Sequence, residues 1–180
     1  VNPTHSYIMT VHVARGQGID YSAFTVFDIT EIPYKVVAKY RSNLVAPLVF
    51  PNIINIIGKK YNDAYILIEV NDIGSQVSDV LHHDLEYENL FSTAWYGRHG
   101  QQLSGFVGGK RDSQFGVRTT KSMKKIGCSN LKALIEDDKL LVPDYDIISE
   151  LTTFVSSGDS FSAEEGANDD LVITLVLFAW

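Results

Sequence analysis

The chain has 180 residues, which is enough for one domain with a substantial hydrophobic core. Hydrophobic residues make up 45% of it, but no apolar run is long enough to cross a bilayer, so we expect a soluble protein without a membrane partner. The first residues lack the basic leader and apolar block of a secretory signal, and the single cysteine, Cys128, excludes an internal disulfide. These features predict a reducing compartment, with Cys128 as a small core residue.

The first third of the chain predicts a β-meander followed by a helix. Residues 7–14 and 23–29 have the apolar patterns of strands, and the Gly-containing turn at 15–22 joins them into a hairpin. Residues 36–40 predict a third strand, and residues 47–60 a helix.

Glu69 ends the next predicted strand. Residues 65–69 are mostly apolar and β-branched, and an Asn-Asp turn follows them. Ligands of open α/β sheets bind at the carboxyl ends of strands, so Glu69 is well placed for chemistry. The alternative is a surface residue at a fraying strand end.

Two adjacent acids, Asp169 and Asp170, stand directly before the apolar residues 171–180. Neighbouring carboxylates repel each other, and a divalent cation is the commonest chemical reason to place them at a buried edge. Mg²⁺ and Mn²⁺ prefer such oxygen ligands. The alternative is the acidic first turn of a helix, with Asn168 as its N-cap.

The remaining patterns complete a recognisable order of elements. They are helices at 74–85, 119–137 and 147–154, a short strand at 140–142 and a hairpin turn at 156–160. Three strands, a helix, a strand carrying Glu69 and a late helix carrying Asp170 are the order of the ribonuclease H-like fold. We therefore expect an α/β domain in which helices flank a mixed sheet of the resolvase or integrase type.

Five stretches of the chain carry a specific resemblance to a known family. They are residues 18–23, 68–74, 84–88, 125–132 and 163–172. In these stretches the chain resembles the nuclease domain of the large terminase subunit of tailed bacteriophages, the motor that packages and cuts viral DNA. The resemblance implies a single nuclease domain over residues 1–180, taken from a longer chain whose ATPase domain is absent. The Gly-Gly-Lys-Arg at 108–111 accordingly lacks the spacing and hydroxyl of a phosphate-binding loop.

The cutting site of this family is a cluster of three acids. The resemblance implies that Glu69 and Asp170 are two of them and that Asp20 is an auxiliary acid, whereas the first acid is replaced here by His12. It also implies two Mg²⁺ or Mn²⁺ ions, with Glu69, Asp170, His12 and Asp169 as ligands. One metal would deprotonate the attacking water while the other stabilises the leaving oxygen. A neutral imidazole binds one Mn²⁺ but cannot bridge two ions, and it suits Mg²⁺ poorly.

His12 decides how active such a site would be. It is in phase with Ile8 and Thr10, so we expect its side chain to face Glu69 on the neighbouring strand. We also expect Glu69 and Asp170 to converge within reach of one divalent cation. His12 is a natural variant, an inactivated site or the mark of a degenerate domain, and the remaining interpretation is a structural histidine on the inward face. The prediction is weak Mg²⁺ binding and slow or absent DNA cutting.

Basic residues are concentrated in one segment of this acidic chain. Residues 98–125 hold seven Lys or Arg and one acid, a net charge of +6 against −13 for the remainder. This asymmetry is typical of a phosphate-binding surface beside an acidic cleft, and the alternative is an ordinary solvated face. The many glycines predict a long flexible loop or hairpin. The candidate DNA-binding residues are Arg98, Lys110, Arg111, Arg118, Lys121 and Lys124.

The leading hypothesis is a metal-dependent endonuclease domain that cuts concatemeric viral DNA during packaging. The alternative is a catalytically silent DNA-binding and motor-coupling module, and a third option is another enzyme of this superfold, such as a junction resolvase. The implied partners are double-stranded DNA, the ATPase domain of the same polypeptide, the portal protein and the small terminase subunit. The implied location is the host cell cytoplasm.

Overall fold

A mixed five-stranded sheet forms the centre of the computed structural model, which describes residues 1–18, 20–105, 113–158 and 160–180. The strand order is β4-β1-β2-β3-β8, in which β1, β2 and β3 are antiparallel neighbours, while β4 runs parallel to β1 and β8 parallel to β3. These strands are β1 (Tyr7–His12), β2 (Ser22–Asp28), β3 (Tyr34–Ser42), β4 (Tyr65–Ile68) and β8 (Leu140–Leu141).

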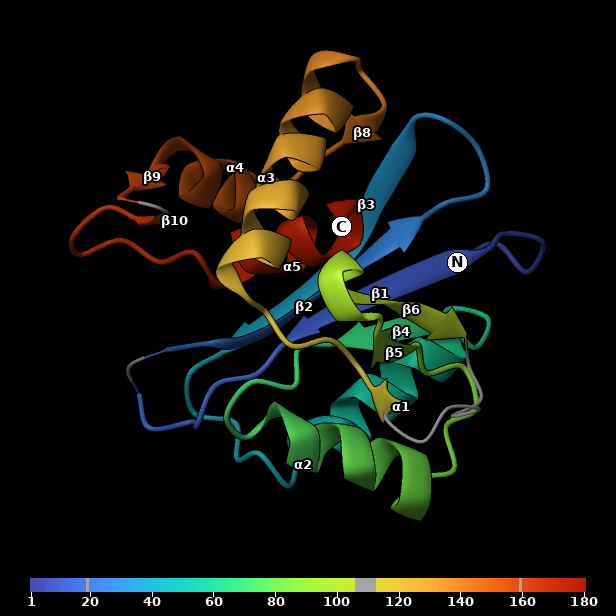
Figure 1. The fold of residues 1–180 in the computed structure, drawn as a ribbon. Helices are drawn as coiled ribbons and strands as arrows, with labels where there is room; N and C mark the ends of the chain where they lie inside the picture. The colour runs from blue at the N-terminus through green and yellow to red at the C-terminus, as the bar shows by residue number, and fades with distance from the viewer. Residues whose placement is uncertain (19, 106–112, 159) are drawn as a thin grey trace.

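Helices cover both faces of this sheet. In Figure 1, α1 and α2 lie on one side and α3, α4 and α5 on the other. A π-helical turn, Val80–Asp84, continues α2. The helices are α1 (Phe50–Lys60), α2 (Gly74–Asp79), α3 (Lys121–Glu136), α4 (Tyr145–Thr152) and α5 (Asp170–Ala179).

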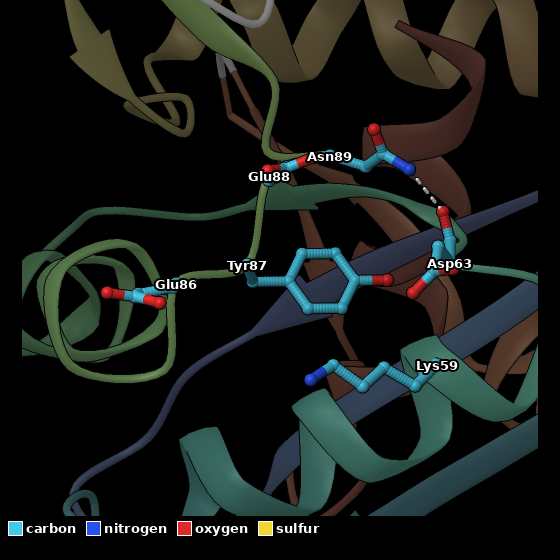
Figure 2. Close-up of a pocket in the computed structure, with 6 residues that line it drawn as sticks. All are labelled: Lys59, Asp63, Glu86, Tyr87, Glu88 and Asn89. Carbon is cyan, nitrogen blue, oxygen red and sulfur yellow. Dashed lines mark hydrogen bonds between the residues drawn. The ribbon is translucent and has the colours of Figure 1, made fainter.

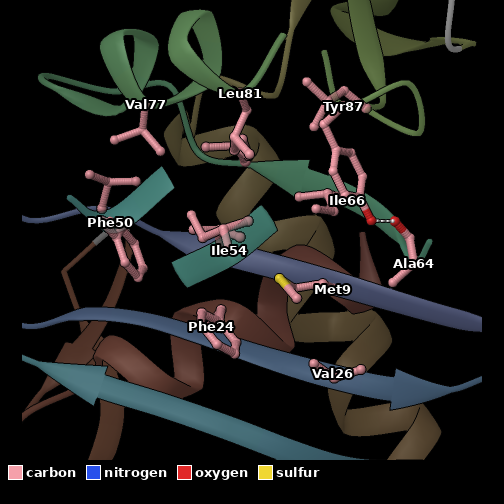
Figure 3. Packing of buried hydrophobic residues seen from close by; sticks show 14 of the residues in the cluster. Met9, Phe24, Val26, Phe50, Ile54, Ala64, Ile66, Val77, Leu81 and Tyr87 are labelled. Atoms are coloured by element: carbon pink, nitrogen blue, oxygen red, sulfur yellow. Dashed lines mark hydrogen bonds between the residues drawn. The ribbon is translucent and has the colours of Figure 1, made fainter. Parts of the chain in front are cut away.

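Strand alternation divides the core between the two faces. Met9 and Val11 of β1 are fully buried in the cluster on the α1 side. Figure 3 shows Met9 in this cluster together with Phe24 and Ile54. Thr10 faces the opposite way, and its hydroxyl donates to the carbonyl oxygen of Thr174 in α5 at 2.7 Å. Because side chains alternate along a strand, His12 shares the α5 side with Thr10.

The second core surrounds α5, which explains the long apolar run at the end of the chain. Eight of the ten residues of α5 are buried, since the sheet, α3 and α4 all pack against this helix. Leu171 and Leu175 belong to one buried cluster with Phe27 of β2 and Ile147 of α4. A helix that is apolar on all sides is typical of such a fully enclosed position.

Two small sheets extend the domain. Ser92 and Thr93 in β5 pair with both β6 and β7, and β9 pairs with β10 in the predicted hairpin around 156–160. The expectation of a loop or simple hairpin within residues 98–125 is therefore incomplete. This segment contains β6 and β7, and both strands pair with β5, which precedes the segment. The strands are β5 (Ser92–Trp95), β6 (Gln101–Gly105), β7 (Gln114–Phe115), β9 (Phe154–Ser157) and β10 (Ser160–Ala163).

The predicted elements are present, with shifted ends. The third strand is longer than residues 36–40, α1 begins at Phe50 instead of residue 47, and α3 begins after Thr120, whose side chain accepts a hydrogen bond from the amide of Met123. Phe154, which was predicted to end a helix, instead begins β9. None of the helices in the described part of the chain has both the length and the apolar character to cross a membrane.

Candidate active site

The parallel pairing of β1 and β4 brings Glu69 beside His12. Val11 and Ile68 are register partners, and the amide of Glu69 donates to the carbonyl of Val11 at 2.9 Å. Glu69 is 7% exposed. The chain then turns so sharply that a Cβ on Gly74 would lie 1.9 Å from the carbonyl oxygen of Glu69, so this position admits only glycine without a backbone shift.

Asp170 reaches the same place from the start of α5. It is 5% exposed, and its Oδ1 accepts a hydrogen bond from the amide of Tyr21 at 3.3 Å. Thr174, one turn further along, fixes the helix over the sheet, because it bonds Thr10 in β1 and Thr25 in β2. Asn168 is not the N-cap, as one interpretation of the sequence held. Asp169 occupies that position, and its side chain accepts a hydrogen bond from the amide of Ala163 instead of capping the first turn.

The ring of His12 lies between these two carboxylates. Its Nδ1 contacts Oε2 of Glu69, and its Nε2 lies 3.3 Å from Oδ1 of Asp170. Glu69 and Asp170 thus approach the imidazole at its two nitrogens, and their convergence on one divalent cation stays a prediction.

This arrangement favours a positive charge on His12. Burial by itself lowers the pKa of His12, but the hydrogen bonds to Asp170 and Glu69, together with their negative charges, raise it to about 10. Burial raises the pKa of Glu69, and the hydrogen bond and charge of His12, with a smaller contribution from Lys124, bring it below its ordinary value. His12 is therefore an imidazolium at neutral pH and faces the ionised side chain of Glu69.

The site opens into an acidic hollow of about 320 Å³. Asp20 and Asp169 border it together with His12 and Asp170, so it gathers the predicted site acids other than Glu69. Arg15 and Asp72 also line it and form a two-pronged ion pair, with nitrogen–oxygen distances of 2.6 and 2.7 Å. Sequence reasoning missed this pair, although each residue closely follows the carboxyl end of β1 or β4.

The donor set, as arranged, does not fit a divalent metal ion. Within the part of the chain that the structure describes, no group of three or more His, Cys, Asp or Glu side chains is placed to hold a metal. Glu69 and Asp170 direct oxygens at the ring of His12, whose positive charge would repel a cation. Asp169 uses an oxygen for the amide of Ala163.

One of the predicted DNA-binding residues lies close to this site. The charge of Lys124 acts on Glu69, and its ammonium lies 5.6 Å from the centre of the Phe154 ring. The segment before α3 is fixed there because Asn71 and Thr119 exchange hydrogen bonds of 2.7 and 2.9 Å.

The other basic candidates fall into two groups. Arg118 and Lys121 are exposed around the start of α3, and the exposed Arg98 precedes β6, whose Gln101 bonds the backbone of Arg118. Lys110 and Arg111 lie outside the described residues.

A second hollow, of about 280 Å³, lies beside α1 (Figure 2). Tyr87 points across it toward Asp63, and the phenol donates to the carbonyl of Ala64 at 2.8 Å. Asn89 donates to the carbonyl of Asp63 at 2.6 Å. These two hydrogen bonds hold the backbone directly before β4 in place, so we assign the residues around this hollow a structural role.

Comparison with known protein families identifies the family of this chain. Residues 9–178 match the family described as the terminase RNaseH-like domain. The chain belongs to this family. Both the family resemblance and the ribonuclease H-like α/β fold expected from the sequence are thereby confirmed.

Solved structures of terminase nucleases share the fold. The large terminase nuclease of thermophilic phage G20c with bound magnesium has a TM-score of 0.73 at 21% identity, covering 99% of this chain and 82% of that one. The Thermus phage P74-26 large terminase nuclease domain has a TM-score of 0.69 at 22% identity, covering 98% and 79%. The G20c nuclease has also been crystallised with cobalt and with zinc.

Proposed function

We propose that this domain is built to cut concatemeric viral DNA during genome packaging, and that His12 holds the present form at low metal affinity and low activity. Membership of the terminase RNaseH-like family supports the first part. The second part rests on one observation, the ring of His12 lying between Glu69 and Asp170. Its positive charge neutralises the carboxylates that would otherwise attract a divalent cation.

The proposed substrate is double-stranded DNA held against α3. The charge of Lys124 acts on Glu69, and Lys121 and Arg118 extend the positive charge over the exposed start of the helix. Contacts to phosphates suit an enzyme that cuts many sequences, because the phosphate backbone carries no direct sequence information. As part of a terminase, the domain would act with the ATPase domain of its polypeptide, the portal protein and the small terminase subunit in the host cytoplasm.

Plasmid nicking by a His12→Asp variant tests this proposal. The variant replaces the cation by a third carboxylate, and we expect Mg²⁺-dependent nicking to rise by at least about 100-fold. Gln17→Asp is the matched control, since it adds a carboxylate to the same hollow at a position outside the candidate ligand set, and it should leave nicking unchanged. Adding Glu69→Gln to His12→Asp should abolish the gain.

The silent DNA-binding module is the second candidate, and the misfit between the donor set and a metal ion favours it. A folded His12→Asp form that binds DNA but does not cut would select this candidate. Robust nicking by the His12 form would contradict both the inhibitory role of His12 and the silent module.

A further inference from the structure

The start of α5 is capped from another helix. The first amides of a helix need outside acceptors, yet the side chain of Asp169 at the N-cap position bonds Ala163. Glu150 of α4 supplies the acceptor, because its Oε2 accepts hydrogen bonds from the amides of Leu171 and Val172 at 2.8 and 3.2 Å. These two residues directly follow Asp170.

Glu150 is itself held in a buried position. It is 5% exposed, and its Oε1 accepts a hydrogen bond from Nη1 of Arg41 at 2.7 Å. A buried carboxylate with this many partners has little freedom to rotate, and removing one partner of such a pair is usually costly. Glu150 therefore fixes the first turn of α5 relative to β3.

Arg41 also contacts Tyr21, a residue that hydrogen-bonds Asp170. The guanidinium of Arg41 lies 4.9 Å from the centre of the Tyr21 ring, and the amide of Tyr21 donates to Oδ1 of Asp170. The Arg41–Glu150 pair thus touches both groups that locate the Asp170 carboxylate: the first turn of α5 and the loop before β2.

We propose that Glu150, held by Arg41, is a positioning residue that sets the Asp170 carboxylate in the active site. The catalytic consequence rests on the proposed function, but the geometric one does not. A displaced Asp170 would lose its contacts with His12 and Tyr21, and in a cutting-competent form its oxygens would no longer converge with those of Glu69. Misplacement of about 1 Å can lower a rate about 100-fold.

The test compares Glu150→Ala and Glu150→Gln with Asp146→Asn as control. Asp146 lies on the same helix and pairs with Lys39, so its variant changes a carboxylate of α4 without touching α5. The Arg41–Glu150 pair borders a hollow of about 260 Å³, so water can reach the truncated side chain and the fold should survive. Circular dichroism and the amide spectrum would verify folding.

NMR of the chain gives the geometric readout. In Glu150→Ala we expect the amides of Leu171 and Val172 to exchange with solvent at least about 10-fold faster, and the amide of Tyr21 and the ring of His12 to shift. Glu150→Gln keeps an oxygen acceptor and should restore part of both effects. Faster exchange at Leu171 and Val172 with unchanged Tyr21 and His12 signals would overturn the proposal and leave Glu150 as a helix cap alone.

Nicking in the His12→Asp background gives the second readout. Adding Glu150→Ala should lower kcat at least about 10-fold with little change in the KM for DNA, because DNA binding uses other residues. An unchanged kcat would overturn the catalytic role. If His12→Asp itself is inert, the proposed function fails, and the NMR result still decides whether Glu150 positions Asp170.

Discussion

His12 lies between the two buried acids Glu69 and Asp170 in the folded chain. Glu69 and Asp170 are each less than a tenth exposed, and like charges so near one another oppose folding unless a cation separates them. The imidazolium does this with both ring nitrogens. At this residue, the contacts that stabilise the fold are the ones that we propose to oppose metal binding.

Stability should therefore depend on pH through His12. Its folded pKa of about 10 lies above the ordinary value of 6.5, so its proton-linked contribution is complete below about pH 6.5 and is lost as the pH rises toward 10. We expect His12→Asn to cost at most about 3–5 kcal/mol near pH 6 and progressively less toward pH 10. Urea unfolding in EDTA at several pH values measures this difference, and a constant or widening gap would contradict the ion pair.

The sequence allowed the candidate site acids to be named, but not the charge state of the residue between them. Glu69 and Asp170 follow from the apolar segments that they terminate and from the family resemblance. The protonation of His12 was not predictable, because it depends on which groups surround the ring after folding. The role of Glu150 was not predictable for the same reason. That it caps another helix becomes visible only when α4 packs against α5.

At the scale of elements, the contact between α3 and α5 is unusually close. A Cβ on Gly127 would lie 2.6 Å from the carbonyl oxygen of Val176 and 2.7 Å from its Cγ1. Gly127 belongs to one of the stretches that carry the family resemblance, and the packing gives that glycine a physical reason.

Gly127→Ala should therefore destabilise the domain. Alanine improves helix propensity by about 1 kcal/mol, but overpacking against a backbone carbonyl costs about 1–3 kcal/mol, so we expect a net loss. A thermal melt should show a Tm several degrees lower. Ser129→Ala, on the exposed face of the same helix, should stay within about 0.5 kcal/mol of the parent. A Tm raised by Gly127→Ala would contradict the close packing.

The bounds of the secondary-structure elements were predicted most accurately where the hydrophobic periodicity of the sequence is strongest. The meander, the strand ending at Glu69 and α3 have clear periodicity and were predicted within a few residues. The sheet formed by β5, β6 and β7 was missed, because its pairings join short segments up to about twenty residues apart that have no strand pattern of their own. Such pairing is set by tertiary context.

At the scale of the whole molecule, an acidic hollow and a basic helix start lie near one another. The overall net charge of −7 does not reveal that acidic and basic residues are separated on the molecule. This separation concentrates positive charge where DNA is proposed to lie. Lys124 links the two regions, since it acts on Glu69 from α3.

Neutralising Arg118, Lys121 and Lys124 to Gln should weaken DNA binding uniformly across sequences. Each lost phosphate contact should reduce the slope of log K against log salt by about 0.9. Fluorescence anisotropy in EDTA measures binding without cutting. Lys132→Gln is the control, because Lys132 is exposed at the far end of α3 and pairs with Glu136. An unchanged salt slope in the triple variant would contradict the proposed phosphate contacts and would mean that these residues belong to an ordinary solvated surface.

Titration of Mn²⁺ into the His12 and His12→Asp forms at pH 7 tests the central claim most directly, because it measures whether the imidazolium occupies the place of a cation. Calorimetry reports binding whether or not either form cuts DNA, and Gln17→Asp controls for added negative charge alone. We expect His12→Asp to bind Mn²⁺ at least about 10-fold more tightly than the His12 and Gln17→Asp forms. Equal affinity of the His12 and His12→Asp forms would contradict the account.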